Sequence, residues 1–254
     1  MSEPEVQPGA EQPAGLSQWQ RVVNAFTAPS KTFNDIKRGN KSWWLPFLLF
    51  VAFGTGLWAI VGSQVTWQQV VENGLRMAPK QAERLDQLTP EQRESQKKIS
   101  AIVQQYAIWL PAPVWVLVMD LIAAAVLLGT INFGFGGKAT FGQVLAVIWY
   151  AGLPGLIKLV LGAIGLFAGV APESFMPGNP AGTNFGYYLP AADTNKILYA
   201  LATGIDPITI WSLVLTAIGL ATVAGVKRGS GYIAVFGWWA VMLLISVGFT
   251  AAFS

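Results

Sequence analysis

The chain of 254 residues contains no cysteine and no histidine, and only 11% of its residues are charged. Without thiols and imidazoles it cannot form disulfides, use histidine as a general base, or build the common zinc, haem and iron–sulfur sites. The remaining Asp, Glu, Lys, Ser and Tyr residues form no recognisable catalytic motif. These absences predict a protein that is not an enzyme and that carries no cofactor or metal.

Charge is scarce because long apolar runs occupy most of the chain. A helix of about 20 residues, at about 1.5 Å per residue, crosses the hydrocarbon layer of a membrane. Five runs are long enough: residues 43–63, 109–131, 141–170, 208–226 and 232–252. A soluble protein of this size would rarely bury five helices that are apolar on every side. The sequence predicts an all-α integral membrane domain of five transmembrane helices over residues 43–253.

The first 16 residues are rich in proline and glycine and contain no aromatic side chain. Such a segment cannot bury enough surface to offset the entropy of ordering, so we expect a disordered tail. It also lacks a basic start followed by an apolar core, which indicates that no signal peptide is cleaved. The first span is then expected to direct membrane insertion.

Residues 17–42 form a basic, amphipathic segment. Trp19, Val22, Val23 and Phe26 share one face of a short helix that should end near Pro29, and a second short helix should follow before Gly39. Such a segment is typical of helices that lie on an anionic membrane surface. The candidate contacts with lipid headgroups are Trp19, Arg21, Phe26, Lys31, Phe33, Lys37, Arg38 and Lys41.

The positions of Lys and Arg predict the topology. The basic residues before the first span favour a cytoplasmic N-terminus, and Lys138, Lys227 and Arg228 fall in the other inside loops. The first outside loop, residues 64–108, is an exception because it holds six Lys or Arg against five acids. Asp and Glu count little in the positive-inside rule, so the five acids do not offset the six basic residues in this outside loop.

The loop over residues 64–108 has the pattern of helices. Thr66 with Gln69 and Thr89 with Gln92 fit capping boxes, and Ile99, Ile102, Val103 and Tyr106 share one helical face. We expect a helical excursion that lies on the membrane and runs toward the second span, with an interruption at Pro111 and Pro113.

The third run, residues 141–170, is longer than the bilayer needs, since 30 residues would extend about 45 Å. Pro154 between two glycines provides a break. We expect one kinked span; a re-entrant pair, which would leave four crossings, is the alternative. After this run, residues 171–204 predict an irregular aromatic cap, and Asp206-Pro207 predicts the start of the fourth span.

Two charged residues fall near the middle of spans: Asp120 in the second and Lys158 in the third. Each would be costly facing lipid alone, so the simplest expectation is that they face each other. The pair would be a buried ion pair that fixes helix register, with Lys158 alternatively reaching an interface. The functional alternative is a proton or ion relay, or a polar binding point.

Two further patterns have structural explanations. The glycine-rich segment 134–139 lacks the first glycine of a phosphate-binding loop and follows a membrane helix, so we expect a tight turn. Gly165 with Gly169, and Ala217 with Ala221, are small-residue pairs that allow helices to approach closely, within the protein or in a dimer.

Several short motifs occur in a characteristic order: FTAPSKTFNDI at 26–36, WWLP at 43–46, ATFGQ at 139–143, YAGLP at 150–154, DPITIW at 206–211, KRG at 227–229 and WW at 238–239. Their order resembles that of the YIP domain (Ypt-interacting protein) family, in its bacterial members. The resemblance implies five spans and a cytoplasmic N-terminus. Eukaryotic relatives act in membrane trafficking and bind Rab-type GTPases or membrane proteins. This chain lacks their acidic Tyr- and Gly-containing N-terminal signature, so GTPase binding is not implied, and no catalytic residue comes with the family.

The sequence therefore predicts a non-enzymatic membrane protein that scaffolds or assists a membrane protein assembly, in a bacterial cytoplasmic membrane. The expected partners are anionic lipid headgroups and other membrane proteins or a second copy, and not nucleic acid. The alternative is a small transporter or lipid-handling protein with a midplane site at Asp120 and Lys158.

Overall fold

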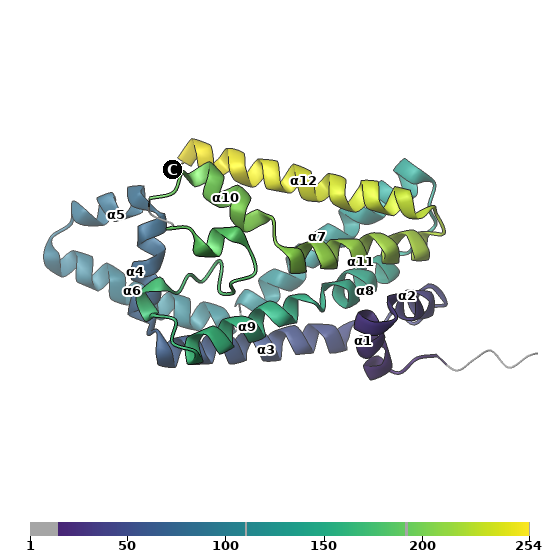
Figure 1. The fold of residues 1–254 in the computed structure, drawn as a ribbon, viewed down its shortest axis with the longest axis horizontal. Helices are drawn as coiled ribbons and strands as arrows, with labels where there is room; N and C mark the ends of the chain where they lie inside the picture. Colours follow the sequence, from purple (N-terminus) through teal and green to yellow (C-terminus); the bar gives the residue numbers. More distant parts are fainter. Residues whose placement is uncertain (1–14, 110, 191–192, 254) are drawn as a thin grey trace, which may run out of the picture.

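The computed structural model describes residues 15–109, 111–190 and 193–253, and every regular element in these ranges is helical (Figure 1). Five helices or helix pairs are long and apolar enough to span a membrane. They are α3 (Trp44–Gln64), α7 (Pro111–Gly129) with the π-helical turn η1 (Thr130–Gly134), α8 (Phe141–Gly152) with α9 (Gly155–Phe167), α11 (Pro207–Ala224) and α12 (Arg228–Phe253). The prediction of an all-α protein with five spanning helices is confirmed.

The shorter helices gather at the two ends of this bundle. At one end lie α1 (Gln18–Thr27) and α2 (Pro29–Lys37) (Figure 1). At the opposite end lie α4 (Trp67–Met77), α5 (Pro79–Asp86), α6 (Pro90–Trp109) and α10 (Lys196–Gly204), with the 3₁₀ turns η2 (Pro172–Ser174) and η3 (Phe185–Tyr188) in the irregular segment between α9 and α10.

The N-terminal helices form as the sequence predicts, but they pack into the bundle. Ser17 and Gln20 form a reciprocal capping box that starts α1. Phe33 and Ile36 of α2 are fully buried, in the same core as residues of α8 and α11. Most of the predicted disordered tail, residues 1–14, lies outside the described residues. Leu16 is held, since its N–H donates to Asp35 at 3.1 Å.

The third run is one kinked span. Residues 153 and 154 separate α8 from α9, and Pro154 cannot supply the N–H that a continuous helix needs there. The two helices follow each other end to end along the bundle, α8 near α2 and α9 along α3 (Figure 1). The re-entrant alternative, in which both ends would lie on one side, is not what the structure shows.

Close helix packing in the bundle depends on small residues. A Cβ added to Gly231 of α12 would lie 2.2 Å from the carbonyl oxygen of Ala217 and 3.0 Å from the Cβ of Ala221. The Ala217–Ala221 pair is therefore used inside the protein, between α11 and α12. Gly169 follows the end of α9 with a φ of 95°, so it does not share a helical face with Gly165.

The glycine-rich segment 134–139 is the tight turn that the sequence predicts. The Asn132 side chain both donates to the carbonyl oxygen of Ala139 and accepts from its N–H, at 2.9 and 3.0 Å. Gly136 has a φ of 69°, which favours glycine. The N–H of Lys138 donates to the carbonyl oxygen of Ala224, so this turn and the turn between α11 and α12 lie at the same end.

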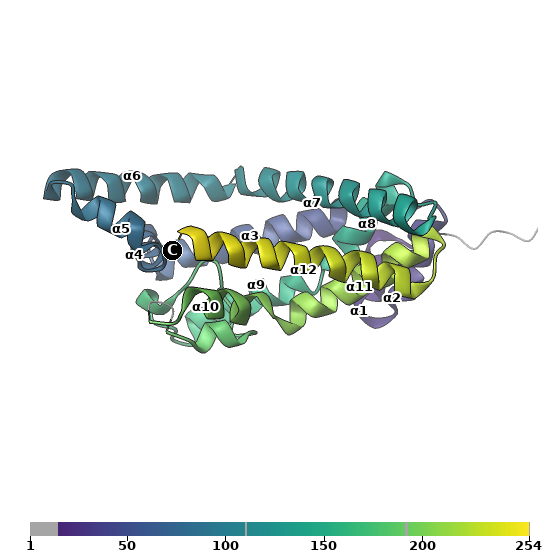
Figure 2. The same cartoon turned by 90° about the horizontal axis from the view of Figure 1, so that it is seen from above.

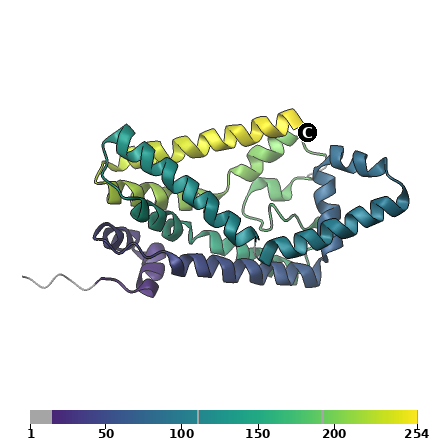
Figure 3. The same cartoon turned by 180° about the vertical axis from the view of Figure 1, so that it is seen from behind.

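The first long loop is helical, as predicted. Thr66 caps α4, and Thr89 and Gln92 form a reciprocal capping box at α6. The α6 and α7 helices run one after the other along one edge of the molecule (Figure 2). Seen from behind, they form an open V (Figure 3). The sequence predicts the interruption at Pro111 and Pro113: α6 ends at Trp109 and α7 begins at Pro111, with residue 110 outside the described residues, while Pro113 lies in the first turn of α7 and does not interrupt it.

Candidate functional site

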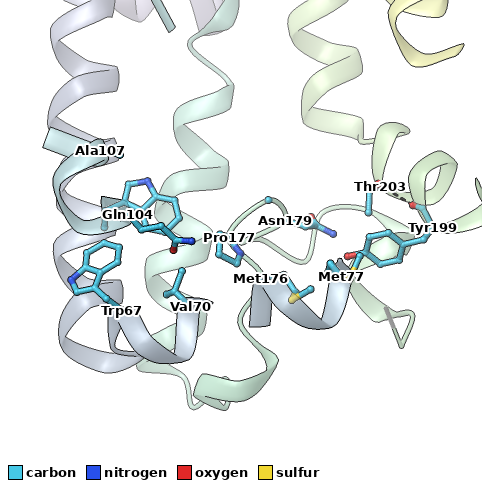
Figure 4. A pocket seen from close by; sticks show the side chains of 13 residues that line it. Trp67, Val70, Met77, Gln104, Ala107, Met176, Pro177, Asn179, Tyr199 and Thr203 are labelled. Atoms are coloured by element: carbon cyan, nitrogen blue, oxygen red, sulfur yellow. Dashed lines mark hydrogen bonds between the residues drawn. The ribbon is translucent and has the colours of Figure 1, made fainter. Parts of the chain in front are cut away.

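A cavity of about 550 Å³ lies among α3, α4, α6, α10 and the segment 176–179 (Figure 4). This volume is in the range of ligand sites, and most lining side chains are apolar. We call it the aromatic cavity; its lining residues are Trp58, Trp67, Val70, Gly74, Met77, Gln104, Ala107, Met176, Pro177, Gly178, Asn179, Tyr199 and Thr203.

The walls of the aromatic cavity are fixed by specific contacts. The rings of Trp58 and Trp67 stack with centroids 6.3 Å apart, across the junction where α3 ends and α4 begins. On the other side, the buried Asn73 amide donates to the carbonyl oxygens of Pro172 and Phe175, at 2.8 and 2.7 Å. These bonds hold α4 against the irregular segment that closes the cavity.

The polar groups in this cavity are few. Asn179 and Asn184 exchange hydrogen bonds at 3.1 and 2.8 Å, which fixes the Asn179 side chain. Burial raises the pKa of the Tyr199 hydroxyl, and a hydrogen bond with Asn179 opposes that change. Gln104 lines the cavity from α6, on the side of Trp67 (Figure 4). The cavity thus combines apolar walls with amide and hydroxyl groups, as ligand sites commonly do.

A second depression, of about 820 Å³, adjoins the first and shares Met77, Gly178, Tyr199 and Thr203 with it. We call it the basic cavity. It lies among α5, α10 and the last turns of α12. Its other lining residues are Ala78, Pro79, Lys80, Gln81, Arg84, Lys196, Ala200, Gly204, Leu243, Ser246, Phe249 and Thr250.

The expected pairing of Asp120 with Lys158 is wrong. The Nζ of Lys158 lies 3.3 Å from Oδ2 of Asp206, which caps the start of α11 through the N–H groups of Ile208 and Thr209. The sequence reveals Asp206 as a helix cap, but its second role depends on α9 passing the start of α11. Sequence spacing carries no such information.

Asp206 is 1% exposed, and it also accepts hydrogen bonds from Thr183 and Asn184. Burial alone would raise the pKa of its carboxyl group. The hydrogen bonds from Thr183, Thr209 and Asn184 and the positive charge of Lys158 outweigh burial and lower that pKa to about 2. The carboxylate therefore ties α9, α11 and the irregular segment together.

Asp120 is half-buried on α7 and has no ion pair or hydrogen bond to any residue that the structure describes. α7 packs against α8, and several of its other side chains are exposed. An acidic group in a span is costly without a partner. Asp120 is thus separate from Lys158, and the structure does not bring the two into one polar site.

Two of the eight expected surface contacts at the N-terminal helices are buried. Phe33 is fully buried, and Arg21 is 1% exposed. The Arg21 guanidinium donates to the carbonyl oxygens of Asn40 and Ser42, lies 3.7 Å from Asp35 and sits 4.9 Å above the Tyr150 ring. Burial lowers the pKa of Arg21, while Tyr150 and Asp35 oppose that change. Their expected contact with lipid is therefore wrong, because both side chains point inward from the N-terminal hairpin of α1 and α2, Arg21 against α8 and Phe33 into the core shared with α8 and α11. The other six are exposed: Trp19, Phe26, Lys31, Lys37, Arg38 and Lys41.

An apolar stripe on α6 is exposed. Ile99, Ile102, Val103 and Tyr106 are 52–68% exposed and fall on one helical face, as the sequence predicts. This stripe, which we call the α6 face, precedes the apolar span that starts at Ala112. Exposed apolar side chains clustered outside a span are typical of contact surfaces.

Comparison with known protein families matches residues 23–249 to the Yip1 domain. The match covers most of the chain and includes all five spans and the helices between them. No curated protein and no solved structure matches the chain.

Proposed function

Because this chain belongs to the Yip1 family and spans the membrane several times, we propose that it is a non-enzymatic protein that scaffolds or assists a membrane protein assembly. The observation that carries the proposal is the α6 face. Its four apolar side chains are more than half exposed although they lie outside the apolar span. A partner helix that covered them would remove this apolar surface from water.

Asp120 supports the same proposal from within the membrane. A half-buried acid in a span is costly when it has no partner, and Asp120 has none among the described residues. A hydrogen-bond donor from another molecule would lower this cost. A polar side chain on a neighbouring membrane helix would supply one. The proposed partner therefore contacts α7 at Asp120 and α6 at Ile102, on consecutive helices.

We propose a topology in which α1 and α2 are cytoplasmic. The exposed Lys31, Lys37, Arg38 and Lys41 lie at that end, and the turns bearing Lys138 and Lys227 meet there too. In this topology the exposed basic residues of the hairpin contact anionic headgroups. We further propose a bacterial cytoplasmic membrane as its location, which the resemblance to bacterial family members supports.

The absence of cysteine makes this topology directly testable. Single cysteines at the exposed positions Gly229 and Gln96 would lie at opposite ends of the bundle. A membrane-impermeant maleimide added to intact cells should label Gln96→Cys and spare Gly229→Cys until the membrane is opened. The reverse pattern would invert the topology.

The assembly proposal is tested by photo-crosslinking in native membranes. A photoreactive amino acid at Ile102 should give a discrete protein adduct, whose partner mass spectrometry identifies as another membrane protein or a second copy. The matched control is Gln96, an exposed polar position on the same helix. Asp120→Asn should weaken the adduct. Adducts with lipid alone at Ile102, or equal protein adducts at both positions, would refute the proposal.

The alternative of a transporter with a midplane site at Asp120 and Lys158 has lost its geometric support, because Asp206 engages the Lys158 ammonium group. A lipid-handling role retains one observation in its favour, the aromatic cavity, which is considered next.

A further inference from the structure

The basic cavity carries a charge imbalance. Lys80, Arg84 and Lys196 are among its lining residues, and no Asp or Glu is. Lys80 and Arg84 are four residues apart on α5, hence on one helical face, and both are exposed. Neither forms an ion pair with a residue that the structure describes, although Glu83 lies on the same helix. An anion would be attracted to this wall of the cavity.

The opposite wall belongs to a membrane span, and its apolar side chains lie beside the hydroxyl-bearing Ser246 and Thr250. Leu243 and Phe249 of α12 line the cavity, and Phe249 is 65% exposed. Leu244 and Ile245 next to them are 68% and 57% exposed on the same helix. Side chains of this kind on a spanning helix face lipid, so the cavity has one side at the bilayer and one side at the basic helix α5.

The aromatic cavity continues from the basic one through the four residues that they share, among them Met77 and Tyr199. Its walls are mostly apolar, and its stacked tryptophans, Trp58 and Trp67, lie at the end of the α3 span. Tryptophan is typical of the level at which headgroups meet acyl chains. A basic site and an apolar site at this level match the two parts of an amphiphile.

We propose that the joined cavities bind one anionic phospholipid. Its phosphate lies against Lys80 and Arg84, and one acyl chain extends past Met77 and Tyr199 into the aromatic cavity. This inference goes beyond the assembly proposal and does not depend on it, since the α6 face and Asp120 line neither cavity.

The test uses full-length protein in lipid nanodiscs that contain either phosphatidylglycerol or phosphatidylcholine with a photoreactive group on the acyl chain. Mass spectrometry then locates the adducts. Phosphatidylglycerol should label peptides with Trp67, Met77 or Tyr199 well above the lipid-facing surfaces of α7 and α12. Phosphatidylcholine should label those peptides about thirtyfold less, because two basic contacts worth about 1 kcal/mol each correspond to about that factor in affinity.

Two variants with matched controls separate the site from general attraction to lipid. Lys80→Gln/Arg84→Gln should reduce cavity labelling about thirtyfold, whereas Lys31→Gln/Lys37→Gln removes the same charge at the other end and should not. Gly74→Leu should fill the aromatic cavity and exclude the chain, because a Cβ on Gly74 meets no other atom within 4 Å. Gly237→Leu, at an equally open position on α12, should leave labelling unchanged.

Labelling spread evenly over the spans, equal labelling by the two lipids, or no effect of Gly74→Leu in folded protein would each overturn the proposal. If Ile102 gave no protein adduct but the cavities were still labelled, the assembly role would be refuted and the lipid proposal would stand.

Discussion

The ammonium group of Lys158 lies 3.3 Å from the carboxylate of Asp206, and Asp206 in turn caps the start of α11. One carboxylate thus receives a cation from α9 and two N–H groups from α11, in addition to its bonds with the irregular segment. Substitutions at this point should therefore affect stability more than function.

Asp206→Ala should destabilise the protein by about 2–4 kcal/mol, because it removes a helix cap and leaves the Lys158 charge without its partner. Asp120→Asn should cost nothing measurable, since Asp120 has no partner among the described residues. The measurement is the fraction of folded monomer after heating in detergent. A double-mutant cycle should couple Lys158→Gln to Asp206→Asn; coupling of Lys158→Gln to Asp120→Asn instead would contradict the structure.

Stability should also depend on pH through Asp206. Its pKa is lowered from 3.8 to about 2 in the folded protein, so the folded state favours the charged carboxylate. That stabilisation is fully present above about pH 4, and it is lost as the pH falls toward about 2; it amounts to about 2 kcal/mol. The difference in melting temperature between wild type and Asp206→Asn should therefore shrink over this window. A constant difference would show that the carboxylate charge contributes nothing.

Arg21→Gln should loosen the N-terminal hairpin. It removes a buried guanidinium that bonds Asn40 and Ser42 and lies over Tyr150, and it leaves Asp35 without that charge. We expect a loss of about 2–4 kcal/mol and faster proteolysis within α1 and α2. Lys31→Gln, at an exposed position on α2, should change neither quantity. Equal effects of the two substitutions would mean that the hairpin does not dock through Arg21.

Gly231→Ala should separate α11 from α12, because the new methyl group would meet the backbone of Ala217, which cannot move aside as a side chain can. Overpacking of this kind costs about 1–3 kcal/mol. Gly229→Ala is a close control, two residues earlier on α12, where a Cβ meets nothing within 4 Å. It should be neutral or stabilise the helix by up to about 1 kcal/mol. Similar melting temperatures for both variants would argue against this helix contact.

The sequence by itself determined the elements of this protein. Five apolar runs identify the spans, because apolar length is a local property that the thickness of a bilayer fixes. Thr66, Thr89 and Asp206 mark helix starts for an equally local reason, since a cap bonds N–H groups two or three residues away. The apolar stripe on α6 follows from helical periodicity, whereas its exposure is seen only in the structure.

Only the tertiary structure decided which distant groups meet. Lys158 pairs with Asp206 rather than Asp120, and Arg21 and Phe33 turn inward, because these outcomes depend on how α9, α11 and the N-terminal hairpin pack. The two cavities likewise combine the consecutive helices α3 to α6 with α10 and α12, which come much later in the sequence. Apolar periodicity shows that a face is covered, but it does not specify by what; helix packing in three dimensions specifies that.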